Sequence, residues 1–145
     1  MMRHSYHQRV YYSDTDCGGI VYHARYLDFA EHARTEMLRE IASRHNLEGA
    51  QSTLFESLNL VFVVKSISCD YQSPAYLDDL LEVETVAESI KRFSLVFRQT
   101  VKRGDAVLCV LKVRVGAIDA TTRRPTPMGE DLLAAFEREG HGTEE

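Results

Sequence analysis

The chain has 145 residues, 44% of them hydrophobic, and a formal net charge of -5. This length predicts one globular domain, residues 1–145, that buries a core without a metal or a disulfide. The negative charge argues against a general nucleic-acid binder. The N-terminus lacks the apolar core of a signal peptide, and no later stretch is long and uncharged enough for membrane insertion. Three widely spaced cysteines, Cys17, Cys69 and Cys109, are typical of a reducing compartment, so we expect a soluble, cytoplasmic protein.

The first predicted elements are a short strand and one long helix. The strand is expected over Tyr6–Tyr12, where turn-forming residues end it. From Ala24 to Ile41, apolar residues recur at steps of three and four, which predicts an amphipathic helix with one buried face. Arg34 falls inside that apolar arc and Glu31 at its edge, one turn apart and able to pair. Two interpretations stay open: an ion pair or snorkelling at a subunit seam, or a second carboxylate in an active site.

The rest of the chain is predicted to be mainly strands. Arg44–Ser57 is polar and is interpreted as a connection, with a short helix or a mobile lid as open alternatives. Strands are expected at Leu58–Tyr71, Leu80–Glu88, Phe93–Val101 and Ala106–Ile118, the first of them central or nearly central in the sheet.

The turns between these strands, and the chain's last helix, define the fold class. The run Arg103-Gly104-Asp105 predicts an antiparallel hairpin between the last two strands. A short closing helix is expected at Asp131–Glu139. One strand, one long helix and a run of antiparallel strands indicate an α+β domain whose sheet curves around the helix.

Chemistry is expected just before the long helix, in the run Asp14-Thr15-Asp16-Cys17-Gly18-Gly19-Ile20-Val21-Tyr22-His23. The two glycines let the main chain turn sharply, and the first amides of a helix have no intrahelical acceptor. Such amides can hold a developing oxyanion. A carboxylate beside them serves as nucleophile or general base, and a histidine donates or relays a proton, so the pattern indicates acyl transfer.

The residues of this run also have other interpretations. Asp14 alone is explained as a cap for the turn or the helix, although capping accounts for only one of the two aspartates. A thiol nucleophile at Cys17 is a second alternative, although no other cysteine adjoins it. A metal site could combine His4, His7 and His23 with the two aspartates, although the spacing fits no familiar zinc signature.

Four stretches together resemble one known family. They are Tyr11–Leu27, Glu31–Leu38, Tyr71–Asp79 and Ser94–Phe97. They closely resemble hotdog-fold acyl-CoA thioesterases of the 4-hydroxybenzoyl-CoA thioesterase class, above all its YbgC-like branch. The resemblance implies a hotdog fold, a curved antiparallel sheet wrapped around a long central helix. It also implies hydrolysis of a small acyl-CoA or hydroxybenzoyl-CoA-like thioester with no metal or other cofactor, coenzyme A being part of the substrate and product. The branch is often associated with the Tol-Pal envelope system.

The resemblance also assigns roles within the run. Asp16 attacks the thioester carbonyl or activates water for that attack, and His23 is a positioning or proton-transfer group. The backbone amides of Gly19, Tyr22 and His23 polarise the carbonyl. Besides Asp16, two other carboxylates, Asp14 and Glu31, are available for a supporting role.

A phosphate contact for coenzyme A is expected in a turn between two predicted strands. Lys91-Arg92 matches the place where related thioesterases hold the nucleotide phosphates, with an ordinary solvated turn as the alternative. Arg123-Arg124 is a second candidate.

The predicted fold leaves an edge strand and an apolar flank exposed, which favours at least a homodimer, with a homotetramer left open. The resemblance places active sites between subunits. Two other functions compete with hydrolysis: a hotdog acyl-CoA binding module without turnover, and a hotdog hydratase or dehydratase. The two aspartates argue against both, because a binder needs no positioned carboxylate and a hydratase needs an acid/base pair aimed at the α and β carbons.

Overall fold

The computed structural model describes residues 3–45 and 59–140. In these two ranges, one antiparallel sheet contains strands β1 (His4–Arg9), β2 (Leu60–Tyr71), β3 (Leu80–Ile90), β4 (Ser94–Arg103) and β5 (Ala106–Asp119). The order across the sheet is β1-β3-β4-β5-β2. The helical elements are a 3-10 turn (Tyr12–Asp14), α1 (Arg25–Arg44) and α3 (Glu130–Arg138).

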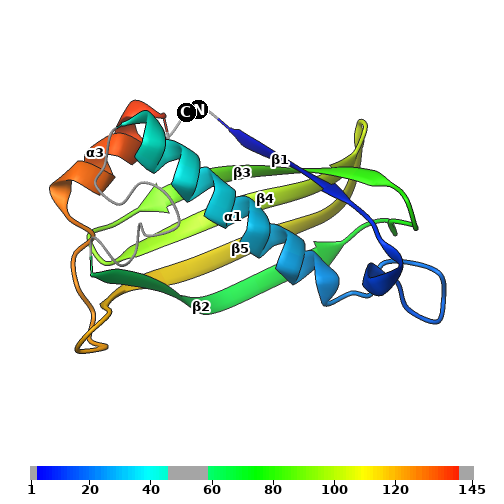
Figure 1. Ribbon diagram of the computed structural model, residues 1–145, viewed down its shortest axis with the longest axis horizontal. Helices are drawn as coiled ribbons and strands as arrows, with labels where there is room; N and C mark the ends of the chain where they lie inside the picture. The colour runs from blue at the N-terminus through cyan, green and yellow to red at the C-terminus, as the bar shows by residue number, and fades with distance from the viewer. Residues whose placement is uncertain (1–2, 46–58, 141–145) are drawn as a thin grey trace.

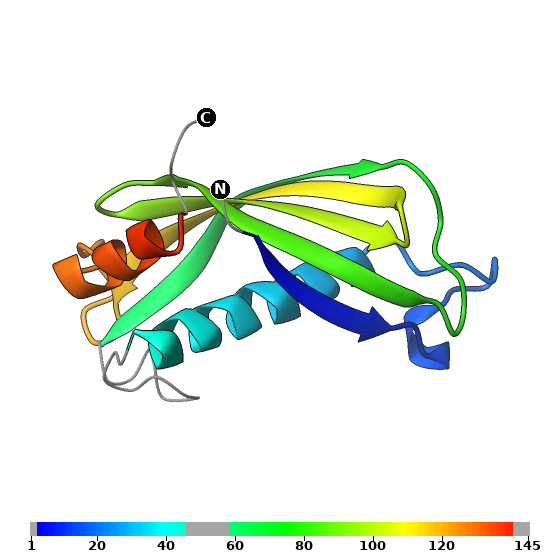
Figure 2. The same cartoon turned by 90° about the horizontal axis from the view of Figure 1, so that it is seen from above.

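The sheet curves around α1, which crosses its concave face (Figures 1 and 2). The buried face of the helix includes the expected Met37 and Ile41, and also Phe29, all against inward-facing strand residues such as Leu81 and Phe97. Each large apolar side chain buried in this way contributes about 1.5–3 kcal/mol to the free energy of folding. The α+β class with a curved antiparallel sheet around a long helix is therefore confirmed.

The predicted elements are present, but some ends and one position differ. The first strand ends at Arg9 rather than Tyr12, because Tyr12–Asp14 forms a 3-10 turn. The helix continues to Arg44. The prediction for the β4–β5 hairpin is confirmed: Arg103 pairs with Ala106, and Gly104 takes a φ of +59° that favours glycine. Residues 46–57 of the expected polar connection lie outside the described residues.

The prediction that the strand ending at Tyr71 is central is wrong. This strand, β2, lies at an edge and pairs only with β5 among the described strands. Its apolar residues are not all core residues, since Val64 is 49% exposed and Ile67 is 38% exposed. The opposite edge, β1, has the polar sequence HSYHQR. The two edges of the sheet therefore present different surfaces.

A hydrogen-bonded polar group lies between α1 and the sheet. Arg34 Nη1 donates to Gln99 Oε1 at 2.9 Å, and Gln99 Nε2 donates to the Ala30 carbonyl at 2.9 Å and to Thr85 Oγ1 at 3.0 Å. Burial lowers the pKa of Arg34, and the negative charge of Glu31 opposes that shift. Glu31 itself accepts a hydrogen bond from Thr35 at 2.9 Å. The expected pairing of Glu31 with Arg34 is thus a longer-range attraction, and the direct partner of Arg34 is Gln99.

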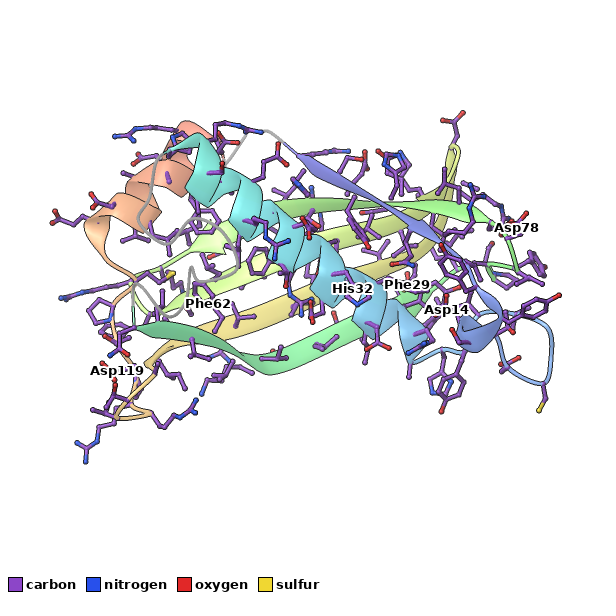
Figure 3. All side chains as sticks on the ribbon, viewed as in Figure 1. Asp14, Phe29, His32, Phe62, Asp78 and Asp119 are labelled. Carbon is purple, nitrogen blue, oxygen red and sulfur yellow. The ribbon has the colours of Figure 1, made fainter. Side chains whose placement is uncertain are left out.

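The two ends of the sheet carry different segments (Figure 1). At one end, the site end, α1 begins, β2 finishes and the β4–β5 hairpin turns. At the other, the basic end, the β3–β4 turn lies beside the loop that leads from β5 to α3. Figure 3 shows Asp14 at the site end and Asp119 at the basic end. Among the helices described, none is both long and apolar enough to cross a membrane.

Candidate active site

The run before α1 folds into a tight loop at the site end. The Asp16 amide donates to the Ile20 carbonyl at 2.9 Å, and the Gly19 amide donates to the Asp16 carbonyl at 3.1 Å. Gly19 has a φ of +80°, which explains a glycine at this position. The Val21 amide donates to the Ala75 carbonyl at 2.9 Å, so the loop is also attached to the segment that follows β2.

Asp14 accepts hydrogen bonds both from its own loop and from the first residue of α1. Its side chain is buried, with Oδ2 accepting from the Tyr11 amide at 2.9 Å and Oδ1 accepting from Arg25 Nε at 3.1 Å. Its carbonyl accepts the Tyr22 amide at 2.9 Å. These contacts connect the residue before the 3-10 turn with the first turn of α1. Asp14 therefore orders the loop, as expected of a capping residue.

Asp16 has the opposite environment, because its side chain is exposed. Its Oδ1 accepts the Gly18 amide at 2.7 Å, which fixes the orientation of the carboxylate. Within the described ranges, Oδ2 has no hydrogen-bond partner. A side chain at Gly18 would place its Cβ 3.2 Å from Asp16 Oδ1, so glycine here leaves room for the carboxylate. An oriented carboxylate with one free oxygen can act as nucleophile or general base.

Of the three amides expected to polarise a carbonyl, two already donate a hydrogen bond within the loop and one does not. Gly19 and Tyr22 donate their amides to the loop carbonyls of Asp16 and Asp14, respectively. The His23 and Ala24 amides have no acceptor in the part of the chain that the structure describes. Ala24 is the N-cap of α1 and makes no side-chain cap hydrogen bond. The open positive end of α1 is therefore formed by His23 and Ala24.

His23 is exposed at the start of α1, beside two tyrosine rings. The centre of its ring lies 4.5 Å from that of Tyr22 and 6.4 Å from that of Tyr71, the latter in a T-shaped arrangement. Its carbonyl accepts a hydrogen bond from the Tyr71 hydroxyl at 2.8 Å. Sequence reasoning gave Tyr71 no role, because its partner is 48 positions away along the chain. The one available signal was that Tyr71 begins one of the stretches shared with the family.

The remaining candidates are spread over the molecule. Glu31 is exposed on α1, about two turns beyond the start of the helix. The exposed basic pairs lie at the basic end, Lys91-Arg92 between β3 and β4 and Arg123-Arg124 between β5 and α3, whereas Asp16 lies in the loop before α1 at the site end. The ten residues of β4 connect these ends, a separation of roughly 33 Å. One protomer does not bring its basic pairs to its own Asp16.

The structure also shows where the residues of the two alternative sites lie, the thiol nucleophile Cys17 and the histidines of a metal site. Cys17 is exposed in the loop, next to Asp16 in sequence. His4 contacts Glu40 near the end of α1 at 2.8 Å, whereas His23 precedes its start. Because Glu40 lies 17 positions after His23, roughly 25 Å of helix separates them. Residues 3–45 and 59–140 contain no group of three or more His, Cys, Asp or Glu side chains placed to share a metal ion.

Comparisons with known proteins agree with this fold and with the family that the sequence resembles. Residues 10–136 match the model of the Thioesterase-like superfamily. The chain is 44% identical over 132 residues to the acyl-CoA thioesterase YbgC of Haemophilus influenzae, covering 91% of this chain and 93% of that protein. It is 39% identical over 131 residues to the acyl-CoA thioester hydrolase YbgC of Escherichia coli O6:H1, covering 90% and 92%.

A solved structure extends the comparison to the fold. The probable thioesterase of Bartonella henselae has a TM-score of 0.76 and 32% sequence identity, covering 86% of this chain and 98% of that chain. The chain therefore belongs to the thioesterase-like superfamily, in its YbgC-like branch. The hotdog fold and the enzyme class expected from the sequence, a thioester hydrolase, are confirmed.

Proposed function

We propose that this protein hydrolyses acyl-CoA thioesters and that Asp16 carries the reaction. The observation behind this proposal is the exposed Asp16 carboxylate, oriented by the Gly18 amide at 2.7 Å, in the loop that leads to the open end of α1. The names of the relatives from Haemophilus influenzae and Escherichia coli support an acyl-CoA substrate. No metal or redox cofactor enters the reaction.

The reaction uses one carboxylate and backbone amides. Asp16 either attacks the thioester carbonyl, forming a mixed anhydride that water then hydrolyses, or removes a proton from the water that attacks the thioester directly. In both routes coenzyme A leaves as the thiol, and the acyl group leaves as a carboxylic acid. His23 positions the substrate or transfers a proton to the leaving sulfur. The amides at the start of α1 hold the negative charge that develops on the carbonyl oxygen. In other enzymes one such donor is worth about 3–4 kcal/mol.

The His23 amide is the member of the expected amide set that suits this role. Gly19 and Tyr22 already donate their amides to carbonyls of the loop, at 3.1 and 2.9 Å. Using either amide for substrate would break a hydrogen bond that shapes the loop. Asp14 supports the site by ordering this loop rather than by reacting.

A homodimer formed through β2 would complete the site. Val64 and Ile67 give this edge an exposed apolar surface, and unpaired backbone groups along an edge strand favour pairing with another chain. Antiparallel pairing of two β2 strands would place the partner's basic end beside this chain's site end. Lys91 and Arg92 would then hold the nucleotide phosphates of a coenzyme A ester whose thioester lies at the Asp16 of the other chain.

Release of free thiol from acyl-CoA esters tests the proposal. A panel of short aliphatic, long aliphatic and aromatic esters, followed with a thiol reagent, should give thiol with at least one class. A non-catalytic binding module would bind the esters and release none. A hydratase or dehydratase would change the acyl chain and leave the thioester intact. Either result would refute hydrolysis.

Two predictions about the cell are part of this proposal. We expect the protein in the cytoplasm, and we expect a functional association with the Tol-Pal envelope system. Cell fractionation tests the first, and the envelope integrity of a deletion strain tests the second.

A further inference from the structure

Tyr71 connects the end of β2 to the start of α1. Its hydroxyl donates to the His23 carbonyl at 2.8 Å. Its ring makes T-shaped contacts with His23, at 6.4 Å between ring centres, and with Tyr26, at 5.6 Å. Tyr71 thus contacts the residues on both sides of Ala24, the N-cap of α1, from a strand that is distant in sequence.

The hydrogen bond to the His23 carbonyl has a consequence for the next amide. The His23 carbonyl and the Ala24 N–H belong to one peptide unit, which is planar and trans, so the oxygen and the hydrogen point in opposite directions. Holding the oxygen therefore fixes the direction of the N–H. The Ala24 amide has no acceptor within residues 3–45 and 59–140, and it is free to meet a substrate oxygen.

The rest of the first turn of α1 is held by other contacts. The Tyr26 hydroxyl accepts the Ala75 amide at 3.2 Å, and Arg25 donates to Asp14 at 3.1 Å. Loss of the Tyr71 hydroxyl would leave these contacts in place. The structural effect of that loss should be confined to the peptide between His23 and Ala24.

The Tyr71 hydroxyl stays protonated, and so can donate a hydrogen bond, across the neutral pH range. Burial is the largest cause that raises the pKa of Tyr71 to about 12, and a hydrogen bond with Cys69 adds to it. The group keeps its proton well above the pH at which the protein would work. The hydroxyl therefore keeps, throughout that range, the proton that its hydrogen bond to His23 requires.

We propose that Tyr71 is a positioning residue for thioester hydrolysis: by holding the His23 carbonyl it aims the Ala24 amide at the developing oxyanion. This inference rests on the proposed function. An amide that is already aimed needs no reorganisation when charge develops on the substrate, whereas a mobile peptide must be ordered during the reaction.

The variant Tyr71→Phe removes the hydroxyl and keeps the ring. The matched control is Tyr76→Phe, because Tyr76 lies in the segment just after β2, at the same end of the sheet, and is 47% exposed, as Tyr71 is. Its hydroxyl has no hydrogen-bond partner among the described residues. We expect Tyr71→Phe to lower kcat about tenfold with KM nearly unchanged, as misplacement of a transition-state donor should. Tyr76→Phe should match the wild type.

A second measurement does not depend on turnover. Backbone ¹⁵N relaxation should show greater motion of the Ala24 amide in Tyr71→Phe than in the wild type or Tyr76→Phe. Equal kcat in the two variants, or equal motion of Ala24, would overturn the inference. So would parallel losses of kcat, substrate affinity and melting temperature, which indicate a merely structural role. Absence of thiol release by the wild type would instead refute the proposed function.

Discussion

Two aspartates separated by a single residue have different environments, and this difference underlies the roles that we propose for them. Asp14 is 5% exposed and bound by Tyr11 and Arg25, whereas Asp16 is exposed with one free carboxylate oxygen. A buried carboxylate whose two oxygens each already accept a hydrogen bond is not available to substrate. The spacing in the sequence cannot distinguish the two aspartates, because both lie between the predicted strand and the predicted helix.

The two aspartates should respond differently to the same change. Asp16→Asn should keep the fold and lower kcat by about 10²–10⁴-fold, since an amide is a poor nucleophile and base. Asp14→Asn should mainly lower the free energy of unfolding, by about 1.5–3 kcal/mol, because it weakens hydrogen bonds to a charged group. Steady-state kinetics and urea denaturation of both variants separate these effects.

Near-normal turnover by Asp16→Asn would remove the carboxylate from the mechanism. Cys17→Ser is the matched control in the same loop, and it should retain activity. If Cys17→Ser were inactive while Asp16→Asn worked, the nucleophile would be the thiol.

At the scale of elements, α1 is attached to the sheet by a polar contact within an apolar interface. Gln99 on β4 joins Arg34, Thr85 and the Ala30 carbonyl. A buried polar side chain of this kind stabilises only the arrangement in which all its partners are present. Apolar packing alone would tolerate small shifts of the helix along the sheet.

Gln99→Leu should lower the free energy of unfolding by about 2–3 kcal/mol, because it leaves the Arg34 guanidinium without its partner. Thr100→Val is the control, since the next residue of the strand faces the outer side and should cost no more than about 0.5 kcal/mol. Urea midpoints measure both. Equal midpoints would mean that water replaces Gln99 at no cost.

Cys109 on strand β5 makes the free energy of unfolding depend on pH in the alkaline range. Burial is the largest cause that raises the pKa of this thiol from 9.0 to about 12. The unfolded thiol ionises near pH 9 while the folded thiol stays protonated, so the unfolded chain loses its proton first. The contribution of Cys109 to stability is therefore complete below pH 9 and is lost as the pH rises toward 12.

As the pH rises from 9 to 11, the free energy of unfolding should fall less for the variant Cys109→Ala than for the wild type. Urea midpoints at a series of pH values measure this difference. Parallel curves for the two proteins would show that another group controls the alkaline decline.

Periodicity in the sequence predicts the elements well but not their neighbours. The helix and the β4–β5 hairpin follow from apolar steps of three and four and from Gly104. The edge position of β2 does not, because exposed apolar residues such as Val64 look the same in a sequence as buried ones. The loop chemistry is visible in one continuous run, whereas the Tyr71–His23 contact depends on the fold.

At the scale of the whole molecule, the distance between the site end and the basic end predicts shared active sites. In the proposed dimer each site combines Asp16 of one chain with Lys91 and Arg92 of its partner. A chain with Asp16→Asn and a chain with Lys91→Ala and Arg92→Ala would then complement each other. One of the two sites in the mixed dimer has all three residues intact.

The mixture should recover sites with the wild-type KM, although neither variant alone has one. The double variant alone should show a raised KM with kcat nearly unchanged, an effect that shrinks at high salt because exposed charges are screened. The wild type and the double variant should use an acyl-pantetheine thioester equally, since this substrate lacks the nucleotide phosphates. Light scattering should show that the mixture contains dimers. If mixed dimers recovered no site with the wild-type KM, the phosphate contact would lie elsewhere.

The attachment of the site loop to the segment after β2 also bears on how the chain folds. Strands β3, β4 and β5 are consecutive and pair with their sequence neighbours, so they can assemble through local contacts. The Tyr71–His23 hydrogen bond, which closes a separation of 48 residues, and the Val21–Ala75 hydrogen bond both join segments far apart in the chain. We therefore expect that most of the sheet can form before the site loop is attached, and that thioesterase activity appears only after these long-range contacts have closed.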